Sequence, residues 1–205
     1  YLSNPAVAGT SPETPIQAMY RNQWAGFDGS PKTTVISGHT QFPNRPGVGG
    51  IVYSDNMGGA FKQTGMELTG TYTIDLNNYD AVSFGVSAMA AQWAFDSSNL
   101  EVWDVNDPAL IGQQSGMAFD ANFGMMIFGD EYSFGFSVPA LLQSSTNLPG
   151  TSLIEDGPGN DWVRHSRFMG HYRYDVNADF SIETAGLIRM TGRTSAQLDA
   201  YLRGT

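Results

Sequence analysis

Large apolar side chains alternate with small or polar residues along several stretches of this chain. Between residues 68 and 74 the apolar positions are Leu68, Tyr72 and Ile74, and threonines stand between them. The same alternation recurs over residues 82–88 and 132–138. Successive side chains of a β-strand point to opposite faces, so each stretch predicts a strand with one apolar face and one small or polar face. Several such strands, joined by turns rich in glycine, asparagine and aspartate, predict an antiparallel sheet.

The composition bears on what covers the apolar faces. Charged residues make up 15% of the chain, against roughly 25% in ordinary soluble proteins. A surface partly covered by lipid or by a partner protein would account for this deficit. No apolar run approaches the ~20 residues of a membrane-spanning helix, whereas a strand of a transmembrane barrel needs only ~10 alternating residues. The sequence therefore excludes a helical membrane protein and leaves a membrane β-barrel open.

The charge distribution argues against nucleic acid as a partner. The net charge is −10, and no lysine or arginine occurs between Lys62 and Arg164. Such an acidic stretch repels phosphates. The absence of cysteine removes disulfides, thiolate metal sites and cysteine nucleophiles. No nucleophile elbow, phosphate-binding loop or H-E-x-x-H spacing occurs either, so we predict no enzyme and expect no cofactor.

Three further groups of residues are interpreted structurally. His39, His165 and His171 lack metal-ligand spacing and are expected to be structural or surface residues. The acidic stretches 104–108 and 155–161 carry oxygen donors without the spacing of an EF-hand, so we expect solvated loops, with bound calcium as the alternative. Asp130 and Glu131 would point to opposite faces of a strand, so they cannot flank one glycosidic bond.

The pattern predicts one domain over residues 1–205 with an up-and-down order of strands. Residues 1–32 are expected to be an N-terminal plug or lid, with one or two helical turns near residues 15–20. Residues 94–121 and 139–162 are expected to contain the loops that leave the sheet. Because both ends of the chain are abrupt, we expect it to be part of a longer barrel. Strands are expected at residues 33–41, 47–54, 60–75, 80–94, 99–104, 122–129, 131–138, 163–175, 178–191 and 195–203.

Aromatic residues, glycines and one arginine crowd residues 20–33. An arginine between aromatic rings can stack on them and donate forked hydrogen bonds. We expect a structural plug, with Trp24 and Phe27 buried and the arginine paired inside the polar lumen of a barrel. A ligand site is the alternative. The residues of this motif are Tyr20, Arg21, Gln23, Trp24, Gly26, Gly29 and Pro31.

Motifs along nearly the whole chain resemble one protein family. They are N-P-A-x-A-G at residues 4–9, Y-R-x-Q-W-x-G-x-x-G-x-P-x-T at 20–33, G-V-G-G at 47–50, N-F-G at 122–124, G-x-S-V-P-x-L-L at 135–142, and R-H followed by F-x-G-x-Y at 164–172. In this order they resemble the PorP/SprF family, outer-membrane proteins associated with type IX secretion in Bacteroidetes. The Y-R-x-Q-W block is the most specific of them.

The resemblance implies a non-enzymatic β-barrel of the bacterial outer membrane. Such proteins help to secrete or retain cargo, including gliding adhesins, and associate with periplasmic or lipoprotein components of the type IX secretion or gliding machinery. We expect the same here, with membrane lipid around the barrel and residues 20–33 occluding its lumen. Two alternatives stay open: a simple diffusion porin, and a soluble extracellular β-sandwich that binds carbohydrate or protein through Trp93, Trp103 and Trp162.

Overall fold

The structure, a computed structural model, describes residues 1–27, 29–43, 45–96, 113–144, 162–177, 180–192 and 194–204. These residues form one antiparallel sheet of ten strands, preceded by a short 3-10 helix, η1 (Pro5–Val7). The strands are β1 (Ile16–Asn22), β2 (Lys32–Gln41), β3 (Pro46–Met57), β4 (Phe61–Asp75), β5 (Ala81–Asp96), β6 (Gln113–Phe128), β7 (Tyr132–Val138), β8 (His165–Asn177), β9 (Phe180–Thr191) and β10 (Thr194–Gly204).

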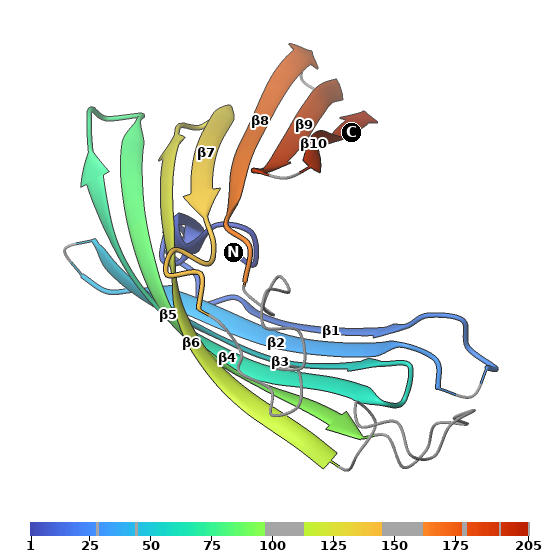
Figure 1. Cartoon of the computed structure of the whole chain (residues 1–205). Helices are drawn as coiled ribbons and strands as arrows, with labels where there is room; N and C mark the ends of the chain where they lie inside the picture. Colours follow the sequence, from blue (N-terminus) through green and yellow to red (C-terminus); the bar gives the residue numbers. More distant parts are fainter. Residues whose placement is uncertain are drawn as a thin grey trace.

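Each strand pairs with its neighbours in the chain, so the expected up-and-down order is confirmed. Among the described residues β1 pairs only with β2 and β10 only with β9, so the sheet is open. Figure 1 shows that the sheet is strongly curved and that the N-terminus lies in its concavity. An open, curved, up-and-down sheet is consistent with part of a β-barrel.

One predicted element has the wrong type, and one predicted strand begins too late. The helical turn expected near residues 15–20 is instead β1, in which Tyr20 pairs with Thr34. β6 begins at Gln113, inside the loop expected over residues 94–121. The loop is expected because residues 94–121 are polar and acidic, but the buried carboxylate of Asp120 accepts hydrogen bonds from the backbone N–H groups of Leu142 and Ser144 at 2.9 and 3.2 Å. The expected strand at 99–104 lies outside the described residues.

The connections between strands differ at the two ends of the sheet. At one end, called here the short-turn end, residues 42–45, 76–80 and 129–131 link successive strands. The last of these is the hairpin turn expected at Gly129, whose N–H donates to the carbonyl of Tyr132 at 2.9 Å. At the other end, called the long-connection end, three of the links are longer and span residues 23–31, 97–112 and 139–164.

Candidate functional site

The two faces of the sheet are inverted relative to those of a soluble protein. On β4, Leu68 exposes 68% of its surface, whereas Thr73 exposes 1%. Between Met66 and Ile74 the strand places its large apolar side chains on the outer, convex face and mostly small or polar ones on the concave face. The alternation continues on β5, where Val86 is exposed and its neighbour Ser87 is buried. An apolar face this large needs an apolar cover.

The apolar outer face ends at a sharp boundary. On β4 its apolar positions begin at Met66 and end at Ile74. These residues span about 26 Å along the strand. At the ~35–45° tilt of barrel strands this is a height of about 20 Å, somewhat less than the ~25 Å apolar band of membrane barrels. The last apolar residues before the boundary are cross-strand neighbours on β2–β5: Ile36, Val52, Met66 and Ala90. The next outward-facing residues toward the long-connection end are also in register, and all are polar: Thr34, Ser54, Thr64 and Gln92.

Beyond this boundary β2–β4 continue as a polar collar at the long-connection end. On the outer face Lys32 pairs with Asn56, and Asn56 pairs with Lys62. On β5 the partner of Lys62 is Ala94, and on β6 the exposed Met117 is in register with Gln92, so the collar does not extend to β6. Because lysines and asparagine avoid hydrocarbon, the collar is suited to water, while the band below it is suited to lipid.

The concave face holds the N-terminal segment, residues 1–10, which Figure 1 shows inside the curve of the sheet. Ala6 and Ala8 are 0% exposed. Three hydroxyls from three strands donate to backbone carbonyls of this segment. They link Ser137 to Ser3 at 2.8 Å, Ser83 to Ala6 at 2.8 Å, and Thr71 to Ala8 at 2.6 Å.

Asn4 anchors the middle of the N-terminal segment. Its side-chain Nδ2 donates to the carbonyl of Met125 on β6 at 3.1 Å. Its Oδ1 accepts from the N–H of Ala6 at 2.9 Å and so caps η1. Both ends of a buried amide are therefore bonded, which avoids the cost of an unpaired buried polar group.

Glycines of the sheet let the backbone of the segment come close. A Cβ atom on Gly85 would lie 2.5 Å from the nitrogen of Ala6, and one on Gly47 would lie 2.9 Å from the carbonyl oxygen of Ala8. A Cβ on Gly124 would overlap Asn4. These positions require glycine because no side chain fits between the sheet and the segment. Serines, threonines and glycines thus form a track for residues 1–10.

The start and end of the segment are also fixed. The hydroxyl of Tyr1 lies 2.7 Å from Thr69 Oγ1, which lies 2.8 Å from Ser87 Oγ. At the other end the N–H of Gly9 donates to Nδ1 of His39 at 3.1 Å, and the ring of Tyr1 packs edge-on against that histidine. His39 therefore has the structural role expected of it.

The predicted plug motif lies mainly in and beside β1. Tyr20 and Arg21 belong to β1 and face opposite sides of the sheet. Trp24 and Phe27 lie in the β1–β2 connection and are 70% and 76% exposed, so their expected burial is wrong. Occlusion of the lumen by residues 20–33 stays a prediction. Gln23, Gly26, Gly29 and Pro31 shape the connection: the N–H of Gln23 donates to the carbonyl of Pro31, and both glycines have positive φ.

Sequence reasoning included residues 1–10 in the plug range but did not identify the track beneath them. The available signal was the small residue at every second position, as at Ser83, Gly85 and Ser87. That pattern predicts a crowded concave face, but it does not indicate which segment crowds it.

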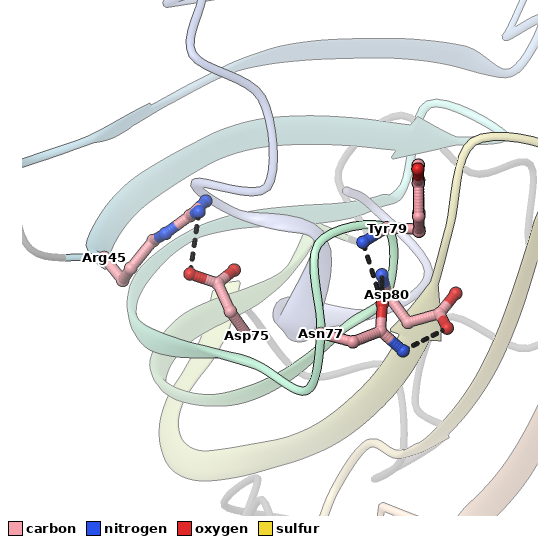
Figure 2. A network of polar contacts seen from close by, with 5 residues as sticks. All are labelled: Arg45, Asp75, Asn77, Tyr79 and Asp80. Atoms are coloured by element: carbon pink, nitrogen blue, oxygen red, sulfur yellow. Dashed lines mark hydrogen bonds and ion pairs between the residues drawn. The ribbon is translucent and has the colours of Figure 1, made fainter.

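Polar contacts fix the short-turn end, as Figure 2 shows. Arg45 forms an ion pair with Asp75 at 2.8 Å. In the β4–β5 turn, Asn77 Nδ2 donates to Asp80 Oδ2 at 2.7 Å, and Asn77 Oδ1 accepts from the N–H of Tyr79 at 2.8 Å. Asp80 accepts hydrogen bonds from Asn77, which has the larger effect, and from Tyr132, and both lower the pKa of its carboxyl. This end is therefore a set of tight, preformed turns.

Within the described residues, no cluster of three or more histidines or carboxylates is arranged to hold a metal ion. The acidic stretches 104–108 and 155–161 lie outside those residues. In the same part of the chain, no helix has the length and apolar character needed to cross a membrane.

The inverted faces, the apolar band and the filled concavity define the class of protein. They have the sidedness of a membrane β-barrel, and the open sheet is consistent with part of one. The chain belongs to the family of the type IX secretion system membrane protein PorP/SprF, whose family model matches residues 1–205. The resemblance seen in the motifs is thereby confirmed. No curated protein matches the chain.

Proposed function

We propose that this chain is a non-enzymatic part of an outer-membrane barrel that helps the type IX secretion system to secrete or anchor cargo at the cell surface. The carrying observation is the apolar outer face with its in-register polar boundary at Thr34, Ser54, Thr64 and Gln92. Hydrocarbon is the cover that such a face requires. Membership of the family supplies the link to type IX secretion.

The unequal lengths of the connections at the two ends of the sheet indicate how the barrel is oriented in the outer membrane. Outer-membrane barrels have short periplasmic turns and longer extracellular loops. The short-turn end would then face the periplasm and its lipoprotein or motor partners. The long-connection end, with the collar that contains Lys32 and Lys62, would face outward and offer a surface to cargo such as an adhesin.

The same features disfavour the two alternatives. A soluble sandwich would cover the outer face with a second sheet, but the described residues form one sheet and leave Leu68 and Val86 exposed. A diffusion porin needs an open polar lumen, whereas the N-terminal segment lies across the concave face from β2 to β8.

Single-cysteine labelling tests the orientation, and the natural chain has no cysteine to interfere. Lys62→Cys lies on the collar and Asn78→Cys in the β4–β5 turn, and both positions are exposed. In intact cells a membrane-impermeant maleimide should label Lys62→Cys and leave Asn78→Cys unlabelled until the outer membrane is permeabilised. Labelling of both at equal rates, or of Asn78→Cys alone, would contradict the proposed placement.

The cargo role is tested by comparing surface proteins of cells with and without this protein. We expect at least one surface protein to be lost from the cell exterior in its absence and restored by the wild-type chain. Gentle solubilisation of the membrane and affinity purification should recover that same protein together with components of the secretion machinery. An unchanged set of surface proteins would refute the cargo role, whatever the result of the labelling.

A further inference from the structure

We propose that the concave face is a binding site for a short peptide folded into turns, and that residues 1–10, which include the 3-10 helix η1, are its resident ligand and close the lumen. This assigns closure to the N-terminal segment and goes beyond the cargo role. It rests on the proposed barrel, because a lumen exists only if the sheet closes.

Recognition is directed mainly at the backbone of the segment. The carbonyls of Ser3, Ala6 and Ala8 accept hydrogen bonds from serine or threonine hydroxyls of β7, β5 and β4. Because every peptide offers backbone carbonyls, these donors would hold any chain that follows the same path. These hydroxyls thus contribute to binding but do not distinguish one peptide sequence from another.

The site would select a peptide by the small size of two side chains, at Ala6 and Ala8, and by the side-chain amide of Asn4. Ala6 and Ala8 are completely buried, and Gly85 and Gly47 touch the backbone beside them. A larger side chain at either alanine would meet the sheet. Asn4 adds a direct side-chain bond to the backbone of β6. The site therefore suits a peptide that forms a 3-10 turn, with asparagine, proline and small residues in the order of residues 4–8.

The segment lies at the depth of the apolar band. Gly85 stands between Phe84 and Val86, which are outward-facing residues of that band, and it pairs with Gly124. The segment touches β3 at Gly47 and reaches β8, where Asn4 Nδ2 lies 3.8 Å from the sulfur of Met169. It thus crosses the concave face at membrane level. Without it, a wall of hydroxyls and glycines would be exposed there, as in a water-filled channel.

The first experiment removes the segment and then adds it back. The full-length protein and a variant without residues 1–10 are reconstituted in planar bilayers. The intact protein should conduct little, and the variant should give a steady open-channel current. The synthetic peptide Y-L-S-N-P-A-V-A-G-T should block this current. The same peptide with Ala6→Trp should not block it, because the position of Ala6 has no exposed surface to accommodate a ring.

A point variant covers the case in which the deletion does not fold. Gly124→Val keeps the whole chain but overlaps Asn4, so it should displace the segment and raise the conductance. The matched control is Gly70→Val on β4, where an added Cβ meets nothing within 4 Å. Heat-modifiable gel migration and resistance to extraction show whether each variant is folded and inserted.

The outcomes separate this inference from the barrel itself. Failure of the intact protein to insert would refute the proposed function. Insertion of the deletion or of Gly124→Val with the low conductance of the intact protein would refute closure by residues 1–10. An open deletion variant that the peptide does not block would refute the binding site. If neither variant folds while Gly70→Val does, the segment is an inseparable part of the core and the idea of a ligand is overturned.

Discussion

A charge placed in the middle of the apolar band should be costly only if hydrocarbon lies there. Val86 on β5 is the sharpest position: it is 57% exposed and is flanked on the outer face by Gly70 and Phe123. It lies midway between Val82 and Ala90, the ends of the band on this strand. Arginine at the bilayer midplane of a barrel costs about 2–4 kcal/mol. Val86→Arg should reduce the free energy of unfolding from membranes by that amount.

The matched control is Gln92→Arg on the same strand and the same face. Gln92 is exposed and belongs to the polar boundary, about 20 Å along the strand from Val86. Near the interface an arginine costs about 0–1 kcal/mol. The two variants carry the same new charge, so the difference between their free energies of unfolding reports what surrounds the side chain.

The assay is reversible folding into lipid vesicles, followed during a guanidinium titration by the heat-modifiable gel shift. A difference of about 2 kcal/mol between the variants corresponds to roughly 30-fold in the folding equilibrium. Equal stabilities of Val86→Arg and Gln92→Arg would refute the reasoning. In a soluble protein the two variants would have nearly equal stabilities, since replacing an exposed valine by arginine at a water-covered surface changes stability by less than about 0.5 kcal/mol.

Three further predictions concern the polar contacts. Ser83→Ala should cost about 1–3 kcal/mol in the same titration, because the buried carbonyl of Ala6 loses its hydroxyl donor. Asp80→Asn should remove a pH dependence of the free energy of unfolding. The pKa of Asp80 is lowered from its ordinary value of 3.8, so the stability that its carboxylate contributes is complete above that pH and is lost as pH falls through the lowered value. A series of unfolding curves at different pH values measures this loss. Arg45→Ala should change stability by less than about 1 kcal/mol, because the ion pair with Asp75 is half exposed, and a double-mutant cycle measures the coupling.

Each of these predictions has a clear contrary result. Ser133→Ala is the control for Ser83→Ala, since Ser133 is only partly buried, and equal losses in both would contradict the role of the Ala6 carbonyl. An unaltered pH profile in Asp80→Asn would exclude this carboxylate as the titrating group. A coupling energy well above about 1 kcal/mol between Arg45 and Asp75 would mean that the pair is shielded from water.

The sheet could be predicted from the sequence because its signal is local. The alternation at Leu68, Tyr72 and Ile74 shows directly which side chains share a face, and the turn at Gly129 marks a hairpin. The strand predicted at residues 122–129 is shorter than β6 because residues 94–121 are polar and acidic, although the carboxylate of Asp120 binds the backbone after β7. A local rule cannot recognise a carboxylate whose partners lie more than twenty residues away.

The candidate site could be predicted only in part because its contacts are distant in the chain. Asn4 meets Met125 and Ser3 meets Ser137, and no spacing in the sequence connects these pairs. The dense motif at residues 20–33 drew attention instead, since arginine and aromatic residues stand out. Its Trp24 and Phe27 lie exposed in a hairpin connection. The small residues Gly85 and Gly124 are less conspicuous in the sequence, but they mark the place where residues 1–10 pack on the sheet.

The low charge content of the chain follows from what covers each face. In the proposed placement the outer face below Thr64 meets lipid, and the concave face beneath residues 1–10 has room only for residues such as Ser83, Gly85 and Gly124. Neither face can hold an unpaired charge at this depth. The bond from Ser83 to Ala6 contributes both to the stability of the sheet and to the position of the segment. If residues 1–10 close the lumen, Ser83→Ala should therefore lower stability and raise conductance together, whereas closure by residues 20–33 would leave the conductance unchanged.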